Sequence, residues 1–361
     1  MAGQTALRDL LKAHTMAADP ALVRREKGGA LRCLACGHSC LMRPGRSGVC
    51  KVRFHSGEGI RAPHGYVAGL QVDPVEKKPF YHAFPGSEAL SFGMLGCDLH
   101  CGYCQNWVSS QTLRDPEAVA RPQFRTAGQL VGLALEYGAP LVVSTYNEPL
   151  ITADWAVEVF REARRHGLVC GFVSNGNATP EVIAYLRPYV QIYKVDLKSF
   201  RDKTYRRLGC KLSNVLETIA TLHDQGFWVE VVTLLVPGLN DGQDELKDMA
   251  SFLVEVSPDI PWHITAFHPD YKMTDRNRTQ AADLERAYDA GKAAGLRFVY
   301  LGNLPGRVGG RESTYCPACG TELIRRHGFQ VMENHLRDGH CPGCQAVIPG
   351  VWETVDTGVY V

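Results

Sequence analysis

The middle of the chain alternates between short apolar runs and longer stretches in which apolar residues recur every three or four positions. The short runs are rich in β-branched residues and bounded by Gly, Pro, Asn or Asp, which predicts buried strands. They span residues 89–95, 141–144, 168–174, 191–195, 228–235, 262–266 and 297–301. The stretches between them predict amphipathic helices. These lie at 127–137, 153–166, 180–186, 213–225, 243–256 and 280–294, the last with Thr279 as its expected cap.

This alternation of strands and helices predicts an α/β fold with a parallel sheet and helices outside it. Polar motifs follow almost every expected strand. A barrel or an open partial barrel is therefore favoured over a doubly wound sheet, because the loops of a barrel converge on one mouth.

Cysteine-rich segments flank this middle part and divide the chain into three. Residues 1–88 begin with an expected helix, with leucines at helical spacing, and continue into a cysteine-rich region. Residues 89–312 hold the repeated strands and helices. Residues 313–361 hold two C-x2-C pairs.

Length and charge limit the function. A chain of 361 residues has room for one large domain with appendages. The formal net charge is +1, with no basic or acidic block, so we expect neither nucleic acid nor an anionic membrane as a partner. No apolar run approaches the ~20 residues that span a bilayer. The N-terminus also lacks the apolar core and cleavage site of a signal peptide, and the expected location is the cytoplasm.

Most of the thirteen cysteines fall into three tight groups. An odd number fits poorly with a full set of disulfides, and C-x2-C pairs in an intracellular chain indicate metal or cluster ligands. Cys170 and Cys210 stand alone, and we expect them to behave as small buried hydrophobic side chains.

The central group is formed by Cys97, Cys101 and Cys104, with the spacing C-x3-C-x2-C directly after an expected strand. A structural zinc site takes four protein ligands. Three clustered thiolates instead suit a four-iron cluster with one iron left open for a substrate or cofactor. A zinc knuckle that takes its fourth ligand from elsewhere is the alternative.

This motif, with an aromatic residue (Tyr103) directly before its last cysteine, resembles that of the radical S-adenosylmethionine (SAM) enzymes. The resemblance implies a partial (β/α)6 TIM-like barrel. It also implies a [4Fe-4S] cluster on Cys97, Cys101 and Cys104, with SAM chelating the open iron. One electron from the reduced cluster would cleave SAM to methionine and a 5′-deoxyadenosyl radical, which abstracts hydrogen from the substrate.

Two of the polar motifs follow the second and third expected strands. Asn147 and Glu148 supply oxygen atoms that an ammonium group such as that of methionine would need, although both also suit a helix N-terminus. Ser174 and Asn175 are compatible with an ordinary turn, and their hydroxyl and amide groups would also suit a carboxylate or a ribose.

Two further motifs follow later strands. Strand alternation places Lys194, Asp196 and Lys198 on one face, where they form either an ion-pair row or a site with Asp196 on a ribose hydroxyl and Lys198 on a carboxylate. His268 ends the sixth expected strand and could face the nucleoside. A lone histidine is more often structural, but this end of a barrel strand makes it a site candidate.

Other motifs are similar to those of the glycyl-radical-enzyme-activase branch. Residues 73–82 and 85–87 in particular resemble the radical SAM member of the AmmeMemoRadiSam set, which is named for its association with an AMMECR1-like and a Memo-like protein. No Gly-Gly-Glu string follows the second strand, so Glu148 would have to meet the SAM amine in a Tyr-Asn-Glu-Pro setting. By this resemblance the SAM-binding residues are Tyr103, Asn147, Glu148, Ser174, Asn175, Asp196, Lys198 and His268.

The expected function is hydrogen abstraction from a protein or peptide partner, either as activation or as side-chain modification, because the activase branch acts on proteins. AMMECR1-like and Memo-like proteins are the partners that the resemblance suggests, with a low-potential donor such as ferredoxin or flavodoxin. A small-molecule substrate is the alternative, and a non-catalytic zinc-binding scaffold is the third hypothesis.

The two terminal groups each offer four thiolates. The N-terminal group has the spacing C-x2-C-x3-C-x9-C and suits either zinc or an auxiliary iron–sulfur cluster, with His38 as an alternative ligand. The C-terminal group resembles a zinc ribbon, and zinc is favoured there over iron. The ligands are Cys33, Cys36, Cys40 and Cys50 in the first group and Cys316, Cys319, Cys341 and Cys344 in the second.

Overall fold

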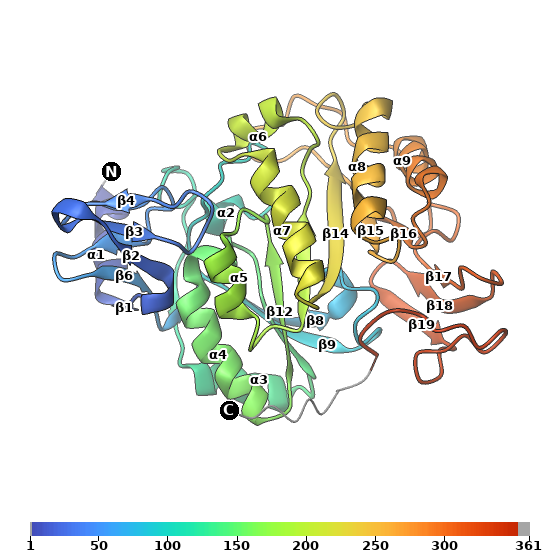
Figure 1. Cartoon of the computed structure of the whole chain (residues 1–361), viewed down its shortest axis with the longest axis horizontal. Helices are drawn as coiled ribbons and strands as arrows, with labels where there is room; N and C mark the ends of the chain where they lie inside the picture. The colour runs from blue at the N-terminus through green and yellow to red at the C-terminus, as the bar shows by residue number, and fades with distance from the viewer. Residues whose placement is uncertain (1, 353–361) are drawn as a thin grey trace.

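An eight-stranded sheet forms the centre of the computed structural model, which describes residues 2–352 (Figure 1). Seven of its strands are parallel, and each lies where the sequence predicts one. They are β9 (Glu88–Gly93), β11 (Leu141–Ser144), β12 (Val169–Ser174), β13 (Ile192–Asp196), β14 (Trp228–Leu235), β15 (Trp262–Ala266) and β16 (Val299–Gly302). The eighth strand, β8 (Gly69–Pro74), pairs antiparallel with β9.

Strand order along the sheet follows chain order without a reversal from β9 to β16. Because crossovers between parallel strands are right-handed, this order places the connecting helices on one face and leaves the other face free. A doubly wound sheet would reverse its order partway. Within the described residues the two edge strands, β8 and β16, do not pair with each other, so the sheet is open.

The predicted helices are confirmed to within one or two residues. They are α3 (Ala127–Glu136), α4 (Ala153–Arg165), α5 (Pro180–Leu186), α7 (Leu212–Asp224), α8 (Gln243–Val256) and α9 (Ala281–Ala294). A further short helix, α6 (Asp202–Leu208), precedes α7, and α2 (Trp107–Ser110) follows the central cysteines.

Local sequence explains several of the helix starts. Thr126 and Gln129 form a reciprocal capping box at α3, and Thr179 caps α5 in front of Pro180. The prediction that Thr279 caps α9 was wrong. Gln280 is the cap, because the Thr279 hydroxyl is used to join two strand ends: it accepts from Phe267 N and donates to the Leu235 carbonyl.

The N-terminal region begins with the expected helix, α1 (Ala2–Ala13), and then forms small antiparallel sheets that the sequence did not reveal. In Figure 1 these lie together at one end of the molecule, beside α4 and α5. One sheet consists of β1 (Thr15–Ala17), β6 (Ile60–Pro63) and β5 (Phe54–His55), and another of β2 (Val23–Arg25), β3 (Leu31–Cys33) and β4 (Leu41–Met42). β7 (Tyr66–Val67) pairs with β10 (Gln123–Phe124).

The C-terminal region is a three-stranded antiparallel sheet at the opposite end (Figure 1). Its strands are β17 (Thr314–Tyr315), β18 (Glu322–His327) and β19 (Gln330–Asn334). Leu323 and Ile324 share one buried cluster with Tyr81, Phe298 and Tyr300. The ribbon therefore packs on the central sheet. Residues 353–361 of the expected C-terminal part lie outside the described residues.

None of the helices within residues 2–352 combines the length and apolar character that a membrane crossing requires.

Candidate active site

A cavity of about 400 Å³ lies against the free face of the central sheet, at the carboxyl ends of its strands. Alternate residues of neighbouring strands line it, in the pairs Lys194 and Asp196, Val232 and Leu234, and His263 and Thr265. Period-two alternation is the signature of a single strand face. One face of the sheet therefore lines this cavity, whose volume lies in the range of ordinary ligand pockets.

The loop that holds the central cysteines closes one end of the cavity. Cys101 and Cys104 line it, and Cys97 lies outside the lining, near the Cys101 thiol. The loop begins at Gly93, where a Cβ atom would lie 2.2 Å from the Thr145 carbonyl oxygen. Only glycine therefore fits between the ends of β9 and β11.

Burial governs the protonation of these thiols. It raises the pKa of Cys97 well above its ordinary value, and it raises the pKa of Cys101 to about 12 and also that of Cys104. Thiolates at this position consequently need positive charge next to them, which iron ions supply. Three neighbouring thiols, two of which line a ligand-sized cavity, fit an iron–sulfur cluster with one open iron.

Asp98, between the first two of these cysteines, holds the loop in place. Its side chain is fully buried and accepts hydrogen bonds from Asn175 Nδ2 (2.7 Å) and Asn177 Nδ2 (2.8 Å). His38 Nε2 lies 3.2 Å from its carbonyl oxygen. Residues from two distant parts of the chain thus converge on Asp98 beside Cys97.

Residues 93–253, which include this loop, match the family model described as Radical SAM superfamily. An uncharacterized protein of Methanocaldococcus jannaschii is 35% identical over 301 residues, which cover 83% of this chain and 88% of that protein. The chain belongs to the radical SAM superfamily.

Other radical SAM proteins are also similar to the chain. The pyruvate formate-lyase-activating enzyme of Staphylococcus epidermidis is 26% identical over 208 residues, 51% of this chain and 78% of the enzyme. The crystal structure of a radical SAM methyltransferase from Sphaerobacter thermophilus aligns with a TM-score of 0.47 at 16% identity, covering 88% of this chain and 85% of that one.

Membership in the radical SAM superfamily implies an enzyme that cleaves SAM at a [4Fe-4S] cluster. The resemblance stated from the sequence is confirmed at this level. The cavity is where both groups would fit, since it adjoins the cysteine loop. One of its walls carries an orphaned polar atom, the hydroxyl of Tyr103, which is buried without a hydrogen-bond partner in the described part of the chain.

The structure divides the expected SAM-binding residues into two sets and leaves His268 apart from both. Tyr103, Asp196 and Lys198 line the cavity. Asp196 accepts from Lys194 Nζ at 2.7 Å and from Lys198 Nζ at 2.9 Å. Burial works against ionisation of Asp196, but these two ammonium groups lower its pKa below the ordinary value. Lys194, Asp196 and Lys198 thus form the ion-pair row and also line the cavity, so the two interpretations of this motif are compatible.

The second set lies behind the cavity wall. The Glu148 carboxylate accepts from Ser174 Oγ (2.7 Å), Asn175 N (2.7 Å) and Leu150 N (3.0 Å). Burial, with Asp98 nearby, raises its pKa to about 8. Asn147 Oδ1 accepts from Met94 N at 3.0 Å. These side chains connect three strand ends to the cysteine loop.

His268 lies at the exposed rim, outside the cavity lining. Its Nδ1 is 3.1 Å from Nε2 of Gln105, which does line the cavity. The structure therefore brings His268 near the end of the cysteine loop but not against the ion-pair row.

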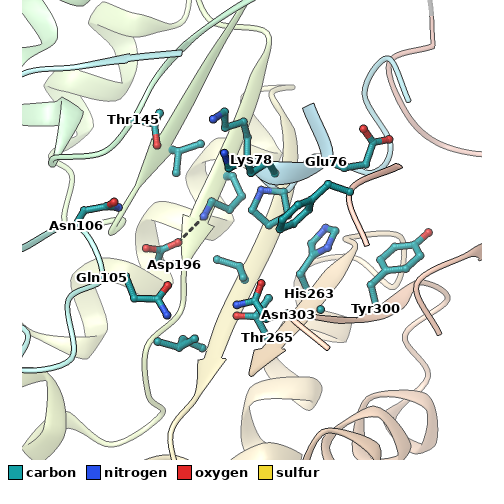
Figure 2. Close-up of a pocket in the computed structure, with 18 of the residues that line it drawn as sticks. Glu76, Lys78, Gln105, Asn106, Thr145, Asp196, His263, Thr265, Tyr300 and Asn303 are labelled. Carbon is teal, nitrogen blue, oxygen red and sulfur yellow. Dashed lines mark hydrogen bonds and ion pairs between the residues drawn. The ribbon is translucent and has the colours of Figure 1, made fainter. Parts of the chain in front are cut away.

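The other end of the cavity contains residues to which the sequence motifs assigned no role in the site. Figure 2 shows Gln105, Asn106 and Asp196 on one side and Glu76, His263 and Tyr300 on the other. Lys78 lies between the two sides; its Nζ donates to Tyr146 OH at 3.1 Å and pairs with Asp73 at 2.5 Å. Burial lowers the pKa of Lys78.

A buried carboxylate organises this second end. Glu230 is fully buried and accepts from Tyr81 N (3.0 Å), His82 N (2.9 Å) and His263 Nε2 (2.6 Å). Burial works against its ionisation, but His263 lowers the pKa of Glu230. Glu230 thus fixes the segment 75–87, which forms one wall of the cavity, onto β14 and β15. An acidic residue within an apolar strand was the one signal in the sequence that could have revealed it.

The C-terminal cysteines form a compact group. Cys316, Cys319, Cys341 and Cys344 place their sulfurs within 4.8 Å of one another, with the closest pairs at 3.6 Å. The same region reaches the cavity, because Phe329, in the turn between β18 and β19, lines it.

Proposed function

We propose that this radical SAM enzyme abstracts hydrogen from a protein or peptide partner that enters the cavity beside the ribbon. The observation that carries the proposal is the cavity itself, with the cysteine loop at one end and an independent set of polar groups at the other. This arrangement provides separate places for SAM and for the group to be modified.

The cofactor end would hold the cluster and SAM. Cys97, Cys101 and Cys104 would ligate the iron. When bound, the reduced cluster supplies the electron that cleaves SAM to methionine and a 5′-deoxyadenosyl radical. Lys198 and Asp196 would orient the charged and hydroxyl groups of SAM. SAM would also provide a hydrogen-bond partner for the Tyr103 hydroxyl. The cysteine loop would be positioned by Asn147, Glu148, Ser174 and Asn175. At the rim of the cavity, His268 would contact the nucleoside part of SAM.

The substrate end is polar and partly closed. Lys78, His263 and Tyr300 would contact the substrate. The sheet, which we propose curves into the partial (β/α)6 barrel of the family, would exclude water from the radical. The residues on the three sides of this end come from segment 75–87, from the sheet and from the ribbon. Together they would set the specificity.

A protein substrate is favoured because relatives of the chain include activating enzymes named for protein targets. Phe329 is 41% exposed at the cavity rim, and Met332 on the same ribbon is 57% exposed. Large apolar side chains left on a surface suit contact with another protein. AMMECR1-like and Memo-like proteins are the partners we propose, with ferredoxin or flavodoxin as the reductant.

A small-molecule substrate is the second candidate. It is favoured by the closed inner end of the cavity, where Lys78 and His263 could bind a compact anionic group.

The C-terminal ribbon is proposed to hold zinc. With zinc–sulfur bonds of about 2.3 Å, tetrahedral geometry places the sulfurs roughly 3.8 Å apart, close to the 3.6 Å observed for two pairs. Thiolates on different irons of a cubane cluster would be spread farther. Residues 1–88, 89–312 and 313–361 are proposed as three parts around this arrangement.

The test is anaerobic reconstitution followed by reduction with titanium(III) citrate in the presence of SAM. The wild type should release 5′-deoxyadenosine, and the Cys97→Ala/Cys101→Ala/Cys104→Ala variant should release none, whereas Cys170→Ala should behave as the wild type. Equal release from the triple variant would refute the function.

A second experiment identifies the substrate. Each candidate protein partner is prepared in deuterated form and added to the reduced enzyme with SAM. Deuterium in 5′-deoxyadenosine identifies the substrate, and transfer only from small metabolites would favour the second candidate.

A further inference from the structure

The four N-terminal cysteines are brought together by two turns. Cys33 N donates to the Cys40 carbonyl at 3.0 Å, which closes the first turn. Val49 N donates to Cys40 Sγ at 3.4 Å, which draws the turn of Cys50 alongside. Cys33, Cys36 and Cys50 are buried and Cys40 is partly exposed. This geometry forms a thiol site with one exposed side.

Arg53 points to an anionic group in this site. Its guanidinium is 1% exposed and pairs with Asp154, yet its Nε and Nη2 have no acceptor among the described residues. Cys33 and Cys50 are among its neighbours. Buried N–H groups without acceptors are unfavourable for folding. A metal centre bound by four thiolates carries net negative charge and would compensate Arg53.

The site adjoins the loop of the radical cluster. A Cβ atom on Gly96, the residue before Cys97, would lie 3.2 Å from the Cys50 carbonyl oxygen. The turn of Cys36 is also docked there, because Gly37 N donates to the Asn177 carbonyl at 2.7 Å and Asn177 in turn binds Asp98. Two cysteine sites thus share one wall.

The spacing of the sulfurs separates this site from the ribbon. In residues 2–352 the ribbon cysteines are the group whose sulfurs all lie within 4.8 Å of one another. Both the N-terminal cysteines and Cys97, Cys101 and Cys104 are more widely spread. Four sulfurs on one zinc must be close together, whereas a cubane cluster spreads them over four irons.

We propose that Cys33, Cys36, Cys40 and Cys50 bind a second iron–sulfur cluster, which passes electrons from a reduced ferredoxin or flavodoxin to the radical cluster. This inference rests on the proposed function for its destination. One electron moves from the donor to the second cluster and from there to the radical cluster. No bond forms or breaks in either step, and the donor is left oxidised by one electron.

The exposed side of the site suits such a donor. Arg43, Arg46 and Lys51 are exposed next to the turns, together with Leu41 at 53% and Val49 at 39%. A basic rim around a small apolar patch complements an acidic electron-transfer protein. The donor would thus dock where Cys40 comes nearest to the surface.

Metal analysis tests the cluster itself. The anaerobically reconstituted wild type should hold about eight irons and matching sulfide. Cys36→Ala/Cys50→Ala should hold about four, and so should the triple variant of Cys97, Cys101 and Cys104. Cys170→Ala is the matched control and should keep the wild-type content. A wild type with about four irons and two zincs would overturn the proposal.

If Cys36→Ala/Cys50→Ala fails to fold, electron paramagnetic resonance of the reduced wild type tests whether a second cluster is present. Two paramagnetic signals should appear on reduction, and SAM should perturb only one of them. A single signal that SAM alters completely would refute a second cluster. These measurements stand even if no SAM cleavage is found, so failure of the proposed function is distinguished from failure of this one.

Choice of reductant tests the relay. Cys36→Ala/Cys50→Ala should keep SAM cleavage driven by titanium(III) citrate and lose cleavage driven by reduced flavodoxin. Equal activity with both reductants would show that electrons bypass the site. Arg46→Glu/Lys51→Glu should lower the flavodoxin-driven rate by about tenfold at low salt, while Lys247→Glu, on the exposed side of α8, should not. Equal rates in the two charge variants would contradict the docking side.

Discussion

Single residues around the cavity differ in whether their polar atoms have partners. Asp98 and Glu148 each accept several hydrogen bonds from neighbouring strand ends, so their carboxylates already have partners within the protein. The Tyr103 hydroxyl is buried without a partner in the described chain. Such an atom is unfavourable for folding and is available to a ligand.

Tyr103→Phe should therefore separate folding from binding. Without SAM the variant should unfold at the same or a higher urea concentration than the wild type, because an unpaired hydroxyl is removed. Its affinity for SAM should fall by roughly tenfold, as expected for one lost hydrogen bond of about 1.5 kcal/mol. Urea unfolding and SAM titration of the reconstituted enzyme measure the two effects.

Tyr205→Phe is the matched control. The Tyr205 hydroxyl accepts from Lys198 N at 2.9 Å, so its loss should destabilise the protein by about 1 kcal/mol. A Tyr103 variant that is destabilised to the same extent, with unchanged SAM affinity, would show that its hydroxyl is bound within the protein.

The cysteine groups could be recognised in the sequence because their spacing is local. Asp98, Lys78 and Glu230 could not, because each acquires its place through contacts with residues far along the chain. Glu148 shows the same limit in another way. Its motif allowed both an amine contact and a cap, and only the fold reveals that its oxygens accept from Ser174, Asn175 and Leu150.

At the scale of elements, the strand ends place the cysteine loop. β9 and β11 meet so closely at Gly93 that no side chain fits, and the loop with Cys97 begins directly after this contact. The accuracy with which these two strand ends pack therefore sets the position of the cluster.

Gly93→Ala should move the loop and lower the iron content. A Cβ atom 2.2 Å from a backbone oxygen forces the strand ends apart, which should destabilise the protein by about 1–3 kcal/mol. Gly132→Ala is the control, since nothing lies within 4 Å of its added methyl group and alanine should stabilise α3 by about 0.5–1 kcal/mol. Normal iron content in the Gly93 variant would argue against this placement.

The regular elements were predictable and the irregular ones were not. Apolar periodicity located the seven parallel strands because both faces of each are buried, and the three- and four-residue spacing of apolar residues located the helices. The strands of the N-terminal region are two to four residues long, too short to show a period. The place of β8 next to β9 depends on pairing, which no local pattern contains.

At the scale of the whole molecule, the ribbon and the cavity wall stabilise each other. Arg326 of the ribbon is buried, donates to Thr314 Oγ1 (2.8 Å) and the Tyr81 carbonyl (2.8 Å), and pairs with Glu76 at 3.4 Å. Burial raises the pKa of Glu76, and Arg326 counteracts this shift. Segment 75–87 therefore depends on a residue about 250 positions later.

Arg326→Met should destabilise the protein by about 3–5 kcal/mol, because it leaves the Glu76 carboxylate buried without its cation. Arg325→Met is the control on the same strand. Arg325 pairs with Glu333 on the surface, where both side chains are nearly half exposed, and its loss should change stability by no more than about 1 kcal/mol. Urea unfolding compares them; equal effects would mean that the buried pair contributes nothing special.

The same interface should respond to acid through His82. Its Nδ1 donates to the Pro349 carbonyl (2.7 Å) and its Nε2 lies 2.6 Å from Tyr300 OH. Burial lowers its pKa from 6.5 to about 4. The unfolded chain therefore binds the proton first, and as pH falls from 6.5 to 4 up to about 3 kcal/mol of stability is lost.

His82→Gln removes this titration. The variant should be less stable at pH 7, because the packing around the ring is lost, but its unfolding free energy should fall less steeply between pH 6.5 and 4.5. The measurement is urea unfolding across that range, and parallel curves for the two proteins would assign the acid sensitivity to other groups.

The contact between Arg326 and Glu76 also bears on how the enzyme is made. Translation completes the cysteine loop and all seven parallel strands before it reaches the ribbon. Until then Glu76 has no cation, and the wall made by segment 75–87 has its contacts to Glu230 but lacks those to Arg326. A nascent or truncated chain could acquire iron and yet lack a finished chamber for the radical. The order of synthesis would thus delay the radical reaction until the ribbon has folded onto the cavity wall. An unfinished protein would then not generate a radical that could damage it.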